Sequence, residues 1–476
     1  MINELRKLKN IIDVLGGTYY VDTTAEKVGP AGTINHYHLA MDALSYLFRK
    51  NTLHLGEPGF GKTTIAKLVA SAFTSLPFDL YTRCQLQGHP EQTKNDLIGR
   101  PDYGELMGKR EVVVWQKSLY LGVIILDEFN RLPAGKQSIM LNAIDTGVFT
   151  ELNATLFDGE RKPFFATANH PDDGTYNITR PMFDRFSLSM ELGYQGVFGL
   201  EDIEEARKNQ RLLCDNELSN QIELVLCDKQ KSHEQKRAYL EEASTQFLLR
   251  LEKRVKDKVR LEKGKEKELY MLEHLTAAER ESAKDAIAKI PLEPEALVFF
   301  HCIATEINHS PTYGSKRSCD PVDAATHAKN LAVSKIKNTM SPRAYSDIRD
   351  YAKGIAALMG HDKVTIDHII SVTPYVLGHR LEFTDDFKAD GSNKGRLRGE
   401  MEGIDCTRRL LNGVDKNYKD AVMPYVQLIV WGIKNPGELS ANQLKQFKEL
   451  KQAFKENKID HPLLKEVLAE LLKHER

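Results

Sequence analysis

Residues 56–64 have the composition of a phosphate-binding loop. An apolar run at residues 53–55 precedes this stretch and a helical pattern at residues 65–73 follows it, which is the strand–loop–helix context that such a loop requires. The stretch satisfies G-x-x-x-x-G-K-[ST] and reads Gly56, Glu57, Pro58, Gly59, Phe60, Gly61, Lys62, Thr63, Thr64. Its glycines allow backbone N–H groups to turn toward phosphates. We therefore predict an ATP site in which Lys62 bridges the β- and γ-phosphates and the Thr63 hydroxyl ligates Mg²⁺.

Two acids directly follow a second apolar run. Residues 123–126 are Val-Ile-Ile-Leu, and Asp127 and Glu128 come next. Ligand-binding groups gather at the carboxyl edge of a parallel sheet, although an acid pair after a strand can also be a helix cap or a solvated turn. Because the chain also carries the phosphate-binding loop, we predict that Asp127 belongs to the Mg²⁺ shell. Glu128 is then the group that polarises the attacking water.

An amide ends a third apolar run. Asn169 follows Phe-Phe-Ala-Thr-Ala at residues 164–168. Asn in this position is often only a turn residue. Beside a γ-phosphate, its amide can bond both the phosphate and the lytic water. We therefore predict that Asn169 senses the bound nucleotide.

Arginines follow shortly after this third run. A phosphoryl-transfer site gains from an arginine supplied by a neighbouring subunit, because negative charge builds up on the γ-phosphoryl oxygens in the transition state. Arg185 is the first candidate and Arg180 the weaker second. The alternative for either residue is a surface salt bridge.

A parallel α/β sheet is needed to bring these side chains together. From residue 53 to residue 192, short apolar runs alternate with helical patterns, which is typical of such a sheet. After residue 194 the strand patterns end. We expect a core with amino-terminal helices over residues 1–195, a charged helical insertion over 196–290, a compact helical part over 291–381 and a helical carboxyl-terminal region over 382–476. A loop is expected around Gly391 and Gly395.

The insertion is rich in Lys and Glu. Residues 250–268 hold nine basic and five acidic side chains. Apolar positions such as Leu251 and Val255 are sparse, so we predict a helical arm that projects from the core and turns near Gly264. The arm could dock an acidic partner surface, or it could be a solvated spacer.

Bulk composition excludes few classes of protein. The 476 residues carry a net charge of −1, so the whole chain has no electrostatic reason to bind nucleic acid or an anionic membrane. No run of ~20 apolar residues suggests a membrane span, and the start of the chain lacks the apolar core of a signal peptide. The six cysteines show no zinc-site spacing. We expect a reduced, cytoplasmic protein.

Several linked motifs resemble the MoxR-type AAA+ ATPases, of the clade with a β-hairpin insert in its second helix. The similarity covers residues 34–195 and 292–381. The motifs are Asp127-Glu128-Phe129-Asn130-Arg131-Leu132-Pro133, Asp184-Arg185-Phe186 with Gly193-Tyr194, Met340-Ser341-Pro342-Arg343-Ala344, Gly360-His361-Asp362 and Leu377-Gly378-His379-Arg380-Leu381. Residues 96–99 fall where the clade carries its hairpin. Phe129 departs from the family, which usually has an aliphatic residue there, and residues 208–290 have no counterpart in its compact members.

The resemblance implies a P-loop AAA+ fold with a helical lid, in which Arg343 is the sensor 2 arginine, acting in its own or an adjacent subunit. It implies an ATP-driven remodeller of proteins, usually a hexameric ring of identical subunits, often working with a von Willebrand factor A protein. An alternative is a nucleic-acid motor or defence-system ATPase. That alternative needs a basic hairpin, whereas residues 97–112 mix Arg100, Lys109 and Arg110 with Asp102, Glu105 and Glu111. A slow nucleotide-dependent scaffold is a third possibility, which intact Glu128 and Arg185 disfavour.

Overall fold

The computed structural model divides the chain into two compact units. One comprises Met1–Glu26 and Thr33–Ala286, and the other Lys27–Gly32 and Ile287–Arg476. The residues described are 3–157, 161–172, 174–262, 270–323, 326, 328–389, 400–434, 439–456 and 461–474. The turn expected near Gly264 and the loop expected around Gly391 lie outside them. Short strands β1 (Ala25–Val28) and β2 (Gly32–Asn35) occur where the chain passes between the units.

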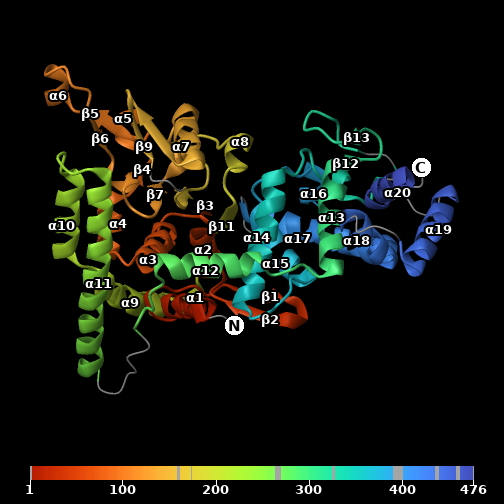
Figure 1. Ribbon diagram of the computed structural model, residues 1–476, viewed down its shortest axis with the longest axis horizontal. Helices are drawn as coiled ribbons and strands as arrows, with labels where there is room; N and C mark the ends of the chain where they lie inside the picture. Colours follow the sequence, from red (N-terminus) through yellow and green to blue (C-terminus); the bar gives the residue numbers. More distant parts are fainter. Residues whose placement is uncertain are drawn as a thin grey trace. The chain divides into compact units, whose positions relative to one another are not determined.

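The first unit is built on a five-stranded parallel sheet (Figure 1). Its order is β11 (Leu188–Glu191), β3 (Asn51–Leu55), β10 (Phe164–Ala168), β7 (Ile124–Asp127) and β4 (Leu86–Gln87). Every residue of β3 and β10 is buried, which explains their continuous apolar runs. In register, Ala168 lies beside Leu55 and Gln87 beside Asp127, so the carboxyl ends of β3, β10, β7 and β4 share one edge.

Helices and two hairpins complete the core. Helices α2 and α3 pack together, and α3 packs on β7 and β10. An antiparallel hairpin of β5 and β6, with α6 between its strands, is the insert predicted near residues 96–99. The bounds are α1 (Asn3–Val14), α2 (Tyr37–Phe48), α3 (Lys62–Thr74), α4 (Phe78–Cys84), α5 (Lys94–Leu97), β5 (Gly99–Pro101), α6 (Tyr103–Met107), β6 (Val113–Trp115), α7 (Ala134–Thr146), β8 (Val148–Glu151), β9 (Ala154–Phe157) and α8 (Arg180–Phe183).

The charged insertion lies against the core along much of its length. It contains α9 (Gly196–Gln210), α10 (Asn216–Cys227), α11 (His233–Leu261) and α12 (Ala277–Ala288). Helix α11 buries a stripe at four-residue spacing, Ala243, Phe247, Leu251 and Val255, and packs on α10, which packs on α4. The sparse apolar positions therefore form one narrow contact face, and α11 does not stand free as an arm.

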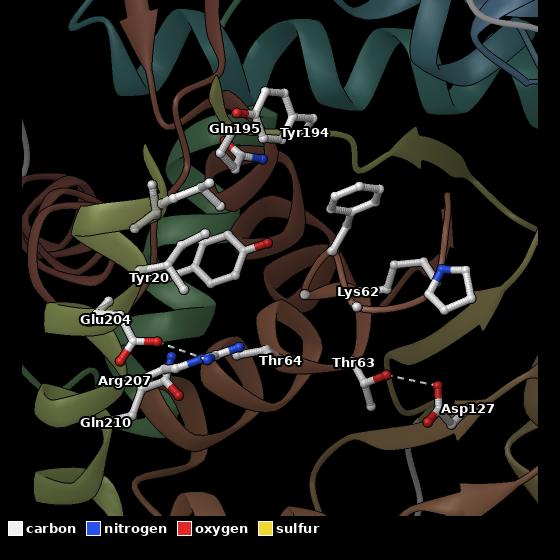
Figure 2. A pocket seen from close by; sticks show the side chains of 18 of the residues that line it. Tyr20, Lys62, Thr63, Thr64, Asp127, Tyr194, Gln195, Glu204, Arg207 and Gln210 are labelled. Atoms are coloured by element: carbon white, nitrogen blue, oxygen red, sulfur yellow. Dashed lines mark hydrogen bonds and ion pairs between the residues drawn. The ribbon is translucent and has the colours of Figure 1, made fainter. Parts of the chain in front are cut away.

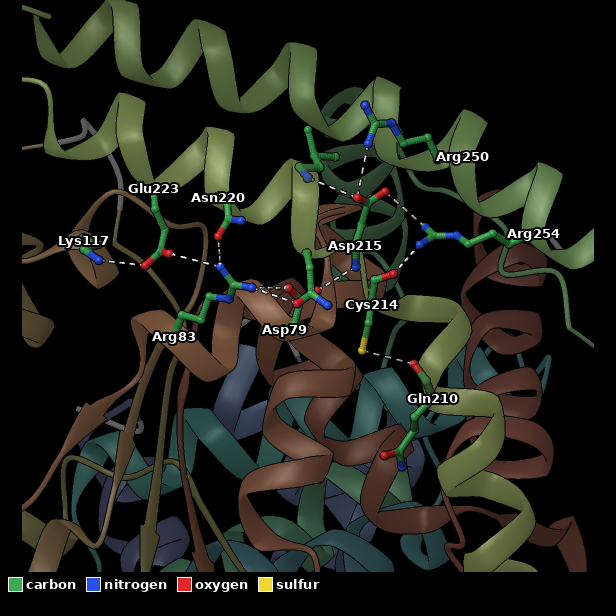
Figure 3. Close-up of polar contacts among 12 residues, drawn as sticks. Asp79, Arg83, Lys117, Gln210, Cys214, Asp215, Asn220, Glu223, Arg250 and Arg254 are labelled. Atoms are coloured by element: carbon green, nitrogen blue, oxygen red, sulfur yellow. Dashed lines mark hydrogen bonds and ion pairs between the residues drawn. The ribbon is translucent and has the colours of Figure 1, made fainter.

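Polar contacts fasten this insertion at the start of α10 (Figure 3). Asp215 caps α10, and its carboxylate pairs with Arg250 of α11 at 3.2 Å. The Asp215 backbone N–H donates to Asp79 of α4 at 2.7 Å. A second link joins Glu223 of α10 to Lys117 of the core at 2.7 Å. These contacts give α10 and α11 one defined position on the core.

The second unit is helical. Helix α15 packs on α14 and α17, while α13 packs on α18 and α20. Buried Glu306 of α13 accepts hydrogen bonds from Ala332 N–H at 3.0 Å and Asn417 of α17 at 3.1 Å. Residues before and after position 381 therefore share one core. The bounds are α13 (Pro294–Asn308), β12 (His309–Ser310), β13 (Gly314–Ser315), α14 (Pro342–Leu358), α15 (Ile366–Leu377), α16 (Asp385–Ala389), α17 (Glu400–Asn417), α18 (Val426–Lys434), α19 (Ala441–Lys455) and α20 (Pro462–His474).

Candidate nucleotide site

The phosphate-binding loop connects β3 to α3, as the sequence predicts. Gly56 has a φ of 136°, and a Cβ there would lie 2.2 Å from the carbonyl oxygen of Leu192. Gly61 has a φ of 82°, and Lys62 begins α3 directly after it. Both glycines take backbone conformations that other residues rarely adopt. The turn they form leads directly into the amino-terminal end of α3, and helix ends of this kind can bind phosphate.

Lys62 connects the phosphate-binding loop to the end of β10, through Asn169. Its Nζ donates to the carbonyl oxygens of Gly56 at 2.6 Å and Glu57 at 2.9 Å, and to Asn169 Oδ1 at 2.8 Å. Burial lowers the pKa of Lys62, while nearby Asp127 opposes the shift. The structure thus brings together two predicted site residues, Lys62 and Asn169, that are far apart in sequence.

Thr63 and Asp127, the two predicted Mg²⁺ ligands, lie next to each other (Figure 2). The Thr63 hydroxyl donates to Asp127 Oδ1 at 2.8 Å, and the Thr167 hydroxyl donates to the same oxygen at 2.5 Å. A hydroxyl and a carboxylate are hard oxygen donors of the kind that Mg²⁺ prefers. These residues therefore fit the ion. Thr167 had no signal of its own in the sequence, because its role depends on β10 lying next to β7.

Glu128 takes a left-handed backbone conformation, with a φ of 53°. Strain of this kind in a residue other than glycine is common at functional sites. Its carboxylate lies 3.3 Å from Asn169 Nδ2, 3.0 Å from Gln87 Nε2 and 3.2 Å from Arg131 Nε. Gln87 and Arg131 are neighbours that sequence reasoning missed, although Arg131 lies within the quoted motif. Together they orient the Glu128 carboxylate beside Asn169.

A pocket of about 710 Å³ opens beside the loop (Figure 2). One wall is the loop with Asp127, Glu128 and Asn169. The other wall is formed by Tyr20, Gln195 and helix α9. The volume is typical of small-molecule sites. Helix α9, which the sequence assigned to the insertion, is therefore part of this pocket, and nothing local in its sequence marks that contact.

The three candidate arginines occupy different places. Arg185 is not among the described residues that line the pocket; its Nε donates to Asp145 Oδ2 of α7 at 3.0 Å. Arg180 is exposed at the start of α8. Arg343 is exposed in the first turn of α14, in the second unit. Thus none of the three candidates is among the described residues that line this pocket, and the arginine found there is Arg207 of α9.

Aromatic packing links the Arg185 segment to the turn after β7. Phe129, the residue that departs from the family, is fully buried and meets Phe186 edge-on with ring centroids 5.4 Å apart. Phe186 also stacks on Phe164 at 6.1 Å. The Phe129 ring therefore packs the turn after β7 against the segment that carries Arg185.

Two features are missing from the described part of the chain. It holds no group of three or more His, Cys, Asp or Glu side chains arranged to bind a metal ion. Its helices include none with the length and apolar character needed to cross a membrane.

Comparisons with known proteins agree with this geometry. Residues 52–188 match the family described as "ATPase family associated with various cellular activities (AAA)", and residues 329–397 match an AAA lid domain. The fold is similar to that of a candidate ATPase from Cytophaga hutchinsonii, with a TM-score of 0.54 and 17% identity over 87% of this chain and 95% of that one. None of the curated proteins compared with this chain matches it. The predicted fold class, a P-loop AAA+ core with a helical lid, is confirmed, and so is the assignment as an ATPase.

Proposed function

We propose that this chain, an ATPase of the AAA+ type, assembles with identical copies into a ring, with six subunits as in MoxR-type ATPases, and uses ATP hydrolysis to remodel or assemble a protein target. The observation that carries the ring is the position of Arg185. This residue lies outside the pocket of its own chain and pairs with Asp145. Arg207 of α9 lines that pocket, but it lies outside the arginine segment after the third strand run, so we assign the catalytic arginine to Arg185 of an adjacent subunit.

The groups within one pocket divide the reaction among them. Lys62 holds the β- and γ-phosphates, and Mg²⁺ held by Thr63 and Asp127 neutralises charge on the phosphate oxygens when bound. Glu128 accepts a proton from the attacking water. Asn169 contacts both Lys62, at 2.8 Å, and Glu128, at 3.3 Å, so it is placed to report the presence of the γ-phosphate to the base.

Arg185 of an adjacent subunit supplies the remaining positive charge in this proposal. In the free subunit Asp145 holds the guanidinium, and both side chains are about one-fifth exposed, at 23% and 18%. Binding of Arg185 to the γ-phosphate of a neighbour therefore exchanges Asp145 for another anionic partner. Arg343 of the lid is the second arginine for the nucleotide, as the family resemblance implies.

The β5–β6 hairpin favours a protein target over nucleic acid. Helix α6 at its tip exposes three apolar side chains: Tyr103 at 62%, Leu106 at 42% and Met107 at 89%. A channel for nucleic acid needs basic side chains at the tip of the hairpin. Exposed apolar side chains are instead suited to binding an unfolded polypeptide. A von Willebrand factor A protein, the family's frequent partner, is a candidate to deliver that target.

ATPase rates in the presence of two classes of polymer test this proposal. We expect that reduced, carboxymethylated lactalbumin, an unfolded protein, stimulates hydrolysis by the full chain and that single-stranded oligothymidylate does not. Met107→Ser should abolish the stimulation and leave the basal rate unchanged, whereas Met423→Ser, an exposed methionine of the second unit at 52%, should change neither. Stimulation by the oligonucleotide alone would favour a nucleic-acid motor instead.

Assembly is measured separately. Native mass spectrometry of Glu128→Gln with ATP should show a closed ring, with six copies expected. A chain that remains monomeric while hydrolysing ATP at the wild-type rate would contradict the ring.

A further inference from the structure

A second cleft lies at the opposite edge of the sheet from the nucleotide pocket. Its core side is lined by Arg49, Gly122 and Pro163. These residues lie just before β3, β7 and β10, respectively, and therefore at the amino-terminal edge of the sheet. Its other side is lined by residues of α11 and α12, the charged insertion. The cleft measures about 790 Å³, within the range of ligand-binding sites. The insertion and the core thus build a cavity that the ATPase reaction does not use.

The lining of this cleft is strongly basic. Five cations and two carboxylates, Glu241 and Glu281, line it, in a chain whose overall net charge is −1, and Glu281 pairs with Arg49 at 2.7 Å. The cations are Arg49, Arg161, Lys162, Arg237 and Arg280. Four of the five are arginines, whose planar guanidinium groups bind carboxylates in a defined orientation. The local excess of positive charge calls for an anionic ligand.

Neutral groups hold some of these cations in place. Arg280 donates to the carbonyl oxygens of Phe73 at 3.0 Å and Leu275 at 2.8 Å, and Lys162 donates to the carbonyl oxygen of Leu119. A carbonyl oxygen orients a cation without cancelling its charge. His274, also in the lining, adds little charge at neutral pH because burial and the neighbouring Arg280 lower its pKa.

Apolar and aromatic groups form the rest of the wall. They include Tyr46, Leu47, Tyr120 and Leu240. The Tyr120 ring is held by Lys236 of α11, whose Nζ lies 4.5 Å from the ring centroid. A ligand that fills the cleft must therefore offer both negative charges and apolar groups.

We propose that this cleft binds an acidic segment of a partner protein, in which Asp or Glu side chains alternate with apolar ones. The two carboxylates among the cations, Glu241 and Glu281, disfavour a uniformly charged phosphate backbone. The position of the cleft also gives the charged insertion a function, because α11 and α12 supply Arg237, Arg280 and the neighbouring acids.

A chain of ion pairs connects the cleft with the arginine proposed to act on an adjacent subunit. Arg161 of the cleft contacts Asp145 Oδ1 at 3.5 Å, and Arg185 contacts Asp145 Oδ2 at 3.0 Å. An acidic ligand that draws Arg161 away removes one cation from Asp145. Hydrolysis should then slow, because Asp145 holds Arg185 more tightly. This step rests on the proposed function, whereas binding to the cleft does not.

Fluorescence anisotropy with the full chain tests binding without nucleotide. The probe is a fluorescein-labelled peptide of alternating Glu and Leu; the comparison probes are a Lys–Leu peptide of equal length and oligothymidylate of equal negative charge. We expect saturable binding of the Glu–Leu peptide only, weakened by added salt. Arg237→Glu should weaken it about ten-fold or more, as expected for loss of a charge-assisted contact. The matched control is Lys253→Glu, the same charge change at an exposed site of α11 outside the cleft, which should alter affinity less than about two-fold.

Three results would overturn the proposal. They are no saturable binding of the Glu–Leu peptide, equal weakening by both α11 variants, and tighter binding of oligothymidylate with the same dependence on Arg237. Thermal unfolding confirms that each variant is folded, and Arg161→Gln provides a second cleft variant that should also weaken binding. In the ATPase assay, saturating peptide should slow the wild type and not Arg161→Gln. An unchanged wild-type rate would overturn the link to Arg185 and leave the binding result as it stands.

Discussion

Replacing the Glu128 carboxylate by an amide separates nucleotide binding from hydrolysis. Glu128→Gln keeps the size of the side chain. Gln87 Nε2 and Asn169 Nδ2 donate to different oxygens of the carboxylate, at 3.0 Å and 3.3 Å, so the single amide oxygen can keep one of these two hydrogen bonds. The amide cannot accept a proton from water at neutral pH. The variant also loses the ion pair with Arg131 at 3.2 Å, whose two side chains are about 30% exposed, at 30% and 32%. A pair this accessible is worth about 0–1 kcal/mol, so the fold should be unaffected.

The size of the effect follows from the role. A positioned general base contributes about 10²- to 10⁴-fold to a rate, which is about 3–5 kcal/mol on the barrier. We therefore expect kcat to fall by about that factor while the Kd for ATP changes by less than about three-fold, since Lys62 and the loop remain.

Phosphate release and binding of a fluorescent ATP analogue measure the two quantities separately. The control is Glu234→Gln, the same exchange in the exposed first turn of α11, which should hydrolyse ATP like the wild type. Turnover by Glu128→Gln equal to the wild-type value would refute the role of Glu128. A parallel loss of nucleotide binding would show that this carboxylate supports the pocket instead of the reaction.

Three further changes should act on binding, packing and pH stability. Lys62→Ala should abolish ATP binding in the same analogue titration, because the phosphates lose their buried cation; retained affinity would contradict the contact. Phe247→Ala should lower the free energy of unfolding in urea by about 3–5 kcal/mol, since the ring is 2% exposed, while Leu249→Ala, at 66%, should cost less than about 1 kcal/mol. Burial and His361 lower the pKa of His368 from 6.5 to about 4, so its contribution to stability is full above pH 6.5 and is lost as pH falls toward 4. His368→Gln should flatten the stability–pH curve in that window, and an unchanged curve would exclude His368 as its source.

Local and distant parts of the site differed in how well the sequence predicted them. The loop at residues 56–64 and the acids at the end of β7 are short contiguous motifs, so their residue types alone predict the chemistry. The structure brings the two motifs together. Tyr20 and helix α9 line the same pocket, and Gln87 contacts Glu128, through long-range packing that leaves no periodic signal near them.

The insertion shows a similar limit. Leu251 and Val255 were visible as sparse apolar positions, but Ala243 and Phe247 complete a four-residue stripe that buries one face of α11. A charged helix needs only such a narrow stripe to pack on a core, so overall polarity favoured the wrong picture of a free arm. The basic cleft arises from that packing, and no sequence motif predicts it.

Mixing two inactive variants tests most directly whether Arg185 completes the site of an adjacent subunit. Arg185→Ala keeps an intact loop, and Lys62→Ala keeps an intact arginine. In a randomly assembled ring of equal amounts, about one quarter of the interfaces join an intact loop to an intact arginine. The account predicts that the mixture regains measurable ATP hydrolysis, while each variant alone shows almost none. A mixture that co-assembles by native mass spectrometry and yet hydrolyses no faster than either variant alone would contradict it.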